Sequence, residues 1–106
     1  MDITLTEVSA MDQISIRTQF SEYHFCVTDP RLCRGFLSGG LLGNRRQEAF
    51  LAGVYLSAGD WSMDSRKLET GRRAVFCVAG KSGLESLTTS VITQLAFAKT
   101  GNANTA

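Results

Sequence analysis

The alternation of apolar and polar side chains along residues 13–28 predicts an extended chain that reverses once. Four side chains share one face at a period of two residues: Ile14, Ile16, Thr18 and Phe20. After Glu22 the period is kept but its phase moves by one residue, and the apolar set becomes Tyr23, Phe25 and Val27. Both sets reach one core only if a bulge or tight turn lies near Ser21-Glu22.

Two further stretches, 31–37 and 49–56, also predict strands. The first is a short extended segment, and the glycines of Ser38-Gly39-Gly40 predict the turn that closes it. The second is apolar without a break, so its period does not separate a strand from a buried helix, and Asn44-x-x-Gln47 resembles a helix start. Its short length and Gly53 favour a central strand.

Residues 72–78 alternate clearly, and the glycine-rich stretch after them predicts a turn. Ala74, Phe76 and Val78 occupy one face of this segment, against Val75 and Cys77 on the other. Gly80-Lys81-Ser82-Gly83 follows, and its two glycines suit a reversal of the chain direction.

Residues 84–98 fit both a helix and a strand. Leu84, Leu87, Val91, Leu95 and Ala98 form a helical stripe. Ser82-x-x-Glu85 also matches a helix capping box. Residues 88–93, however, are rich in β-branched side chains, which favour a strand. We expect a strand, with Leu87, Val91 and Leu95 on one face.

These elements together predict an all-β fold. We expect five to seven mostly antiparallel strands in a small barrel or sandwich. The length of 106 residues suits one domain, which we place at 1–98, and the small polar residues 99–106 predict a frayed tail.

The chain resembles a small family of uncharacterised bacterial β-domains over roughly residues 14–95. The resemblance is carried by short pieces in a fixed order: Thr18-x-x-Ser21-x-Tyr23, Val27-x-Asp29-Pro30, Gly39-Gly40, Leu51-Ala52-Gly53, Gly71 and Thr89-Ser90-x-Ile92. Phe20 and Val54 stand where the family pattern has Asn and Ser. The resemblance implies an all-β fold and no activity.

Composition and charge predict a soluble cytoplasmic protein with an uneven charge distribution. An N-terminus with acids in place of a basic signal region, and three cysteines without a C-x-x-C spacing, indicate a reducing compartment. The longest uncharged run, residues 86–98, is too short for a membrane helix. Residues 1–30 hold five acids against one base, whereas residues 31–73 hold eight bases against four acids.

Three motifs that resemble catalytic or ligand sites have simpler explanations. Gly80-Lys81-Ser82 ends like a nucleotide-binding loop, but Val75 stands where that motif needs a glycine. His24 and Cys26 supply too few ligands for a metal and no third group for a nucleophile pair. Asp60 and Asp64 flank the only tryptophan without the oxygen spacing of a calcium loop. We therefore expect no catalysis, metal or cofactor.

The arginines are the strongest candidates for a binding surface, because a guanidinium is a planar fork suited to carboxylates and phosphates. The candidate contact residues are Arg31, Arg34, Arg45, Arg46, Arg72 and Arg73. Our first hypothesis is an oligomerising or protein-binding module, in which the acidic and basic segments also meet within or between copies. The alternative is a nucleic-acid or anionic-ligand binder, which a net charge of +1 supports only weakly.

Overall fold

Strands make up most of the part of the chain that the computed structural model describes, which is residues 2–55, 61–62 and 66–98. The strands are β1 (Asp2–Thr4), β2 (Gln13–Thr18), β3 (Glu22–Asp29), β4 (Arg34–Gly39), β5 (Gln47–Tyr55), β6 (Trp61–Ser62), β7 (Lys67–Glu69), β8 (Arg73–Gly80), β9 (Gly83–Thr88) and β10 (Ile92–Ala98). Three single 3-10 turns accompany them: η1 (Leu5–Glu7), η2 (Pro30–Leu32) and η3 (Gly40–Leu42).

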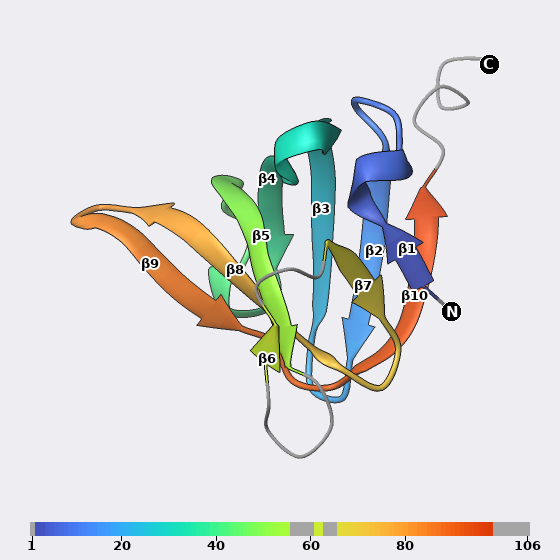
Figure 1. Cartoon of the computed structure of the whole chain (residues 1–106). Helices are drawn as coiled ribbons and strands as arrows, with labels where there is room; N and C mark the ends of the chain where they lie inside the picture. Colours follow the sequence, from blue (N-terminus) through green and yellow to red (C-terminus); the bar gives the residue numbers. More distant parts are fainter. Residues whose placement is uncertain (1, 56–60, 63–65, 99–106) are drawn as a thin grey trace, which may run out of the picture.

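The longer strands form one antiparallel sheet in the order β10-β2-β3-β4-β5-β8-β9, with β6 also paired to β5. The short strands β1 and β7 form a second sheet, which lies in front of the larger one in Figure 1. This arrangement confirms the predicted all-β class. Of the two predicted forms, it is sandwich-like and not a closed barrel.

The large sheet is so strongly curved that its inner face packs on itself. β3 and β8 are three positions apart in the sheet, which would separate them by about 14 Å if the sheet were flat. The rings of Phe25 on β3 and Phe76 on β8 nevertheless lie edge to face with their centroids 5.2 Å apart, and both are fully buried. Beside them, the start of β10 meets the chain before β8, because the Ile92 N–H donates to the Arg72 carbonyl at 2.8 Å.

The predicted change of phase between the first two long strands is a tight turn. The Thr18 N–H donates to the Ser21 carbonyl at 2.8 Å, and the Thr18 hydroxyl accepts from the Ser21 N–H at 3.0 Å. Tyr23 and Phe25 are therefore buried, as expected. Phe20 is 84% exposed and its prediction as a core residue is wrong, because β2 ends at Thr18 and Phe20 lies in the turn.

Residues 31–37 are extended only in part. Pro30 begins η2, since its fixed φ suits the first position of a helical turn, and the Cys33 N–H closes this turn on the Pro30 carbonyl at 3.1 Å. Cys33 then adopts the left-handed conformation (φ 55°), and β4 begins one residue later.

Residues 84–98 are extended, as predicted, but they form two strands and not one. Thr89, which is 1% exposed, interrupts them at the base of β8, where its hydroxyl accepts from the Ala74 N–H at 3.0 Å. Val91 consequently lies in the connection and not on a strand face. The preference for a strand over a buried helix in residues 49–55 and the turn at residues 80–83 are both confirmed.

Because the Phe25–Phe76 contact joins strands that the sheet order keeps apart, we expect Phe76→Ala to destabilise the fold severely. Truncation of a buried phenylalanine costs about 3–5 kcal/mol of unfolding free energy, and urea unfolding followed by circular dichroism measures it. The same substitution at exposed Phe20 is the control, with an expected change within about 0.5 kcal/mol. Similar losses at the two positions would contradict this account of the core.

The three cysteines differ in accessibility, so we expect them to react with iodoacetamide in a fixed order. Burial raises the pKa of the Cys33 thiol, which lowers its thiolate fraction, whereas Cys77 is only partly buried. Peptide mapping by mass spectrometry after a short exposure of the native protein should find Cys77 labelled first and Cys33 only after urea is added. Fast labelling of Cys33 without urea would show that η2 opens readily.

Candidate functional site

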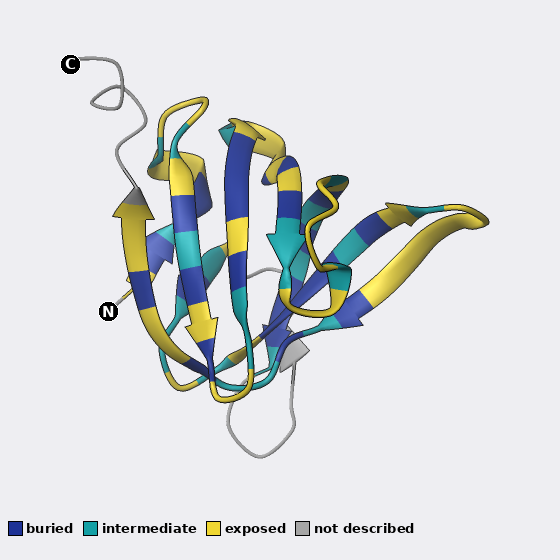
Figure 2. Ribbon diagram, turned by 180° about the vertical axis from the view of Figure 1, so that it is seen from behind, coloured by how far each residue is buried: buried dark blue, intermediate teal, exposed yellow. Residues whose placement is uncertain are grey.

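The β8–β9 hairpin projects from the body of the molecule and forms one edge of the large sheet. Figures 1 and 2 show it extending away from the other strands, with an exposed tip. Residues 81–86 are all exposed. Within the described residues β9 pairs with β8 alone, so half of its backbone N–H and C=O groups face outward without a partner strand.

The register of the hairpin assigns its side chains to two faces. Glu85 lies opposite Val78, and Leu84 lies opposite Ala79. Val78 belongs to the buried core, so Glu85 is on the inner, concave face of the sheet. Leu84 is consequently on the outer, convex face.

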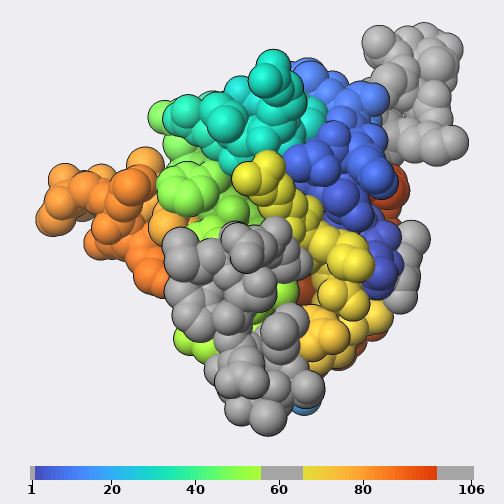
Figure 3. Space-filling model, in the orientation of Figure 1, coloured from blue at the N-terminus to red at the C-terminus, as the bar shows by residue number. Residues whose placement is uncertain are grey.

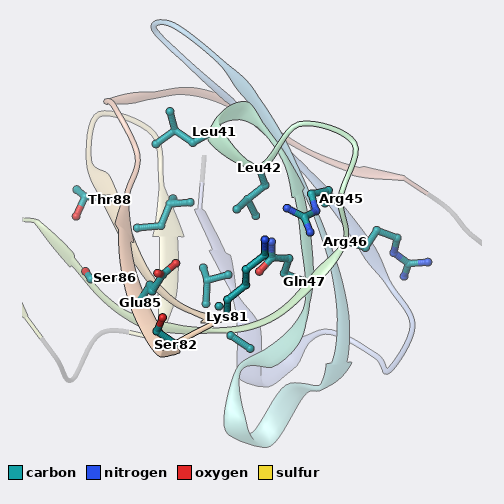
Figure 4. Close-up of a pocket in the computed structure, with 14 residues that line it drawn as sticks. Leu41, Leu42, Arg45, Arg46, Gln47, Lys81, Ser82, Glu85, Ser86 and Thr88 are labelled. Carbon is teal, nitrogen blue, oxygen red and sulfur yellow. The ribbon is translucent and has the colours of Figure 1, made fainter.

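A groove of about 840 Å³ runs between the inner face of the hairpin and the segment that leads from η3 into β5. Each of its two walls contributes its own set of side chains (Figure 4). Leu41, Leu42, Arg45 and Gln47 come from the first wall, and Lys81, Ser82, Glu85 and Ser86 from the second. We call this space the concave groove.

Three cations line the concave groove, Arg45, Arg46 and Lys81, and none has an acidic partner among the described residues. Arg45 and Lys81 direct their charges into the groove. Arg45 and Lys81 enter it from opposite walls, since Arg45 precedes β5 and Lys81 occupies the turn of the hairpin. Glu85 is the acid of the groove, and its carboxylate packs over Gly80, where an added Cβ would lie 2.6 Å from Oε1. The groove therefore presents free cations, a neighbouring carboxylate and several hydroxyl groups.

The opposite face of the hairpin borders a second, apolar depression of about 380 Å³, which we call the convex groove. Its apolar lining is Leu32, Ala49, Phe50, Cys77, Ala79 and Leu84. Leu32 is 57% exposed and Leu84 is 68% exposed, so two large apolar side chains meet water there. The space-filling view shows the hairpin as a lobe that stands apart from the rest of the surface (Figure 3).

The six candidate arginines do not share one face. Arg45 and Arg46 immediately precede β5, whereas Arg73 pairs with Tyr55 at the far end of the same strand, about 26 Å away at the usual rise per residue. Arg46 turns away from Lys81 in Figure 4 and stacks over Phe36, with its guanidinium carbon 5.2 Å from the ring centroid.

The other four arginines lie elsewhere, and three of them have partners. Arg34 pairs with Glu48 at 3.8 Å on the convex face, and Arg72 pairs with Glu69 at 3.3 Å. The Arg73 guanidinium donates from Nε to the Thr89 carbonyl at 3.0 Å. Arg31 is exposed on η2. Of the six, only Arg45 thus combines a position in the concave groove with a free guanidinium directed into it.

Lys81 and the free edge of β9 were missed by the sequence analysis. The turn that carries Lys81 was predicted, but its relation to Arg45 depends on the curvature of the sheet, which no local pattern reveals. The sequence did carry one signal in this exposed run. In β9 the apolar Leu84 faces outward and the charged Glu85 faces inward, which is the reverse of the alternation expected for a half-buried strand.

The acidic N-terminal segment and the basic segment lie next to each other in the sheets, as β3 beside β4 and β1 beside β7. Among the described ion pairs, only Asp2 with Lys67, at 3.7 Å, joins residues 1–30 to residues 31–73. Glu22 instead interacts within its own hairpin. The Ser15 hydroxyl, and then the Arg17 guanidinium at 3.4 Å, lower the pKa of this carboxyl below its ordinary value. The register of β3 and β4 also sets Asp29 of the acidic segment opposite Arg34 of the basic one.

Two of the residues considered for metal binding or nucleophilic catalysis, His24 and Cys26, lie on β3. Within the described ranges, no group of three or more histidine, cysteine or acidic side chains is placed to hold a metal ion. His24 is exposed on β3, with Nε2 3.6 Å from the Glu22 carboxylate, and Cys26 is buried beside it. Asp60 and Asp64 lie outside the described residues.

Comparison with known proteins adds no assignment to this geometry. A scan against protein-family models, a search of curated proteins and a search of solved structures each gave no match. The resemblance to a family of bacterial β-domains therefore stays a prediction. In the described part of the chain, no helix is both long enough and apolar enough to cross a bilayer.

Proposed function

We propose that this chain is a non-catalytic protein-binding module that accepts an extended segment of a partner along the free edge of β9. The supporting observation is the edge itself, six residues from Gly83 to Thr88 without a partner strand in the described structure. Binding of this kind gains affinity from main-chain hydrogen bonds and specificity from pockets for alternate side chains. The concave and convex grooves lie on the two sides of this edge and supply such pockets.

A second copy of the chain fits this edge less well than a different protein does. Antiparallel pairing of two β9 strands about a twofold axis would continue the sheet and put both concave faces on the same side. In the register that centres this pair on Glu85, the two Glu85 carboxylates would stand directly opposite each other on the concave face, and like charges would oppose the contact. We therefore assign the edge to a heterologous partner and treat self-pairing as an outcome of the test.

Nucleic acid is also a weaker fit than a polypeptide. A strand of phosphates binds to a track of several aligned cations, usually with aromatic rings on which bases stack. Here Arg45 and Arg46 are separated from Arg72 and Arg73 by the length of β5, and Glu85 lies within the concave groove.

Cys26, Cys33 and Cys77 are all free thiols, which agrees with a cytoplasmic location.

The edge is tested with a neutral seven-residue peptide that alternates threonine and valine, acetylated and amidated at its ends. We expect the backbone amide signals of residues 83–88 in NMR spectra to shift and to exchange more slowly with solvent when it binds, since they acquire new hydrogen bonds. The control is the same peptide with every backbone nitrogen methylated, which cannot pair with a strand. Changes confined to β10, or none at all, would refute the proposal.

Light scattering at two salt concentrations separates partner binding from self-association. We expect a monomer at low salt, because the Glu85 carboxylates of two paired β9 strands would repel each other. An increase in mass at high salt alone would indicate that screening permits β9 to pair with itself. A stable dimer at low salt, with β9 amides already protected from exchange, would assign the edge to a second copy instead.

A further inference from the structure

We infer that the segment accepted by β9 alternates acidic and apolar residues, an inference that rests on the function proposed above. A strand added beside β9 continues the pleat of the sheet, so its side chains point alternately to the two faces. Those next to Glu85 and Leu87 enter the concave groove, and those next to Leu84 meet the convex groove. The two grooves differ in chemistry, and the alternation follows from that difference.

The concave groove selects carboxylates. Arg45 and Lys81 are exposed cations without an acidic partner in the described structure, and they reach the groove from both walls. A guanidinium donates two parallel hydrogen bonds to a carboxylate, and an ammonium adds a mobile point charge. The Gln47 side chain, half-buried on the same wall, offers a further amide donor.

The convex groove selects apolar side chains. Leu84 on β9, Ala79 on β8 and Phe50 on β5 form one continuous apolar strip across three neighbouring strands, with Leu32 at its end. Burial of a valine or leucine side chain against such a strip removes apolar surface from water on both partners. A polar side chain at these positions gains no comparable contact.

Glu85 sets a limit on the affinity for acidic segments. It lies on the concave face of β9 itself, and within the described structure it pairs with neither Lys81 nor Arg45. A carboxylate on the neighbouring strand directly opposite would be repelled. The partner's acidic residues are therefore expected nearer to the turn, where Lys81 lies, than to the middle of β9.

The inference is tested by fluorescence anisotropy with labelled seven-residue peptides at low salt. We expect the alternating glutamate–valine peptide to bind about tenfold more tightly than the threonine–valine peptide, and the lysine–valine peptide to bind more weakly than either. A peptide with the same four glutamates and three valines in two blocks controls for charge alone. Equal binding of the alternating and block peptides would overturn the inference.

Variants of the groove provide the second arm of the test. We expect Arg45→Glu with Lys81→Glu to abolish the preference for glutamate and to favour the lysine–valine peptide, and Glu85→Gln to tighten glutamate–valine binding about two- to fivefold. Arg31→Glu, on η2 away from the hairpin, is the matched control and should leave the preference intact. A preference that survives the double reversal would place the acidic contacts elsewhere.

The outcomes distinguish this inference from the proposed function. If the threonine–valine peptide protects β9 but glutamate brings no gain, the edge binds strands without charge selection and only the inference fails. If none of the peptides protects β9, both fail. Tighter binding of a labelled seven-nucleotide oligothymidylate, lost with Lys81→Glu, would assign the concave groove to nucleic acid and overturn the inference.

Discussion

The contact between Phe25 and Phe76 holds the structure in its curved form. These rings belong to strands that the hydrogen-bonded order of the sheet keeps three positions apart, yet they touch edge to face in the core. An edge-to-face aromatic pair contributes stability beyond the burial of its apolar area, so this contact stabilises the curved form of the sheet. The inner face is thereby closed over its own side chains together with Ile3, Leu5 and Leu68, which β1, η1 and β7 add to the core.

Curvature also determines where the sheet ceases to be a core. Phe76 and Val78 on β8 point into the closed interior, but the last two residues of the strand, Ala79 and Gly80, lie outside the packed region. Its partner β9 has only Leu87 buried. The same bend brings the segment around Arg45 to face Lys81 across open space. The concave groove is thus the unfilled continuation of the core, lined by polar side chains where the apolar ones end.

Local patterns in the sequence predicted the strands better than their arrangement. The change of phase before Tyr23 and the turn at Gly80 depend on neighbouring residues, so alternation and turn chemistry were sufficient. Phe20 was misassigned because alternation does not mark the residue at which a strand ends. The separation of Arg45 from Arg73 follows from the length and register of β5, and the approach of Arg45 to Lys81 follows from long-range packing. Neither has a signature in the sequence.

The connection at Thr89 has a mechanical consequence for the hairpin. Its buried hydroxyl accepts from the Ala74 N–H, and its own N–H donates to the Ala74 carbonyl at 2.9 Å, so the base of β8 and the end of β9 are fixed together. The turn at Lys81 has no such attachment in the described structure. The hairpin is therefore anchored at its base and free at its turn. A force applied near Lys81 acts on the hydrogen bonds of Thr89 with the longest lever arm that the hairpin offers.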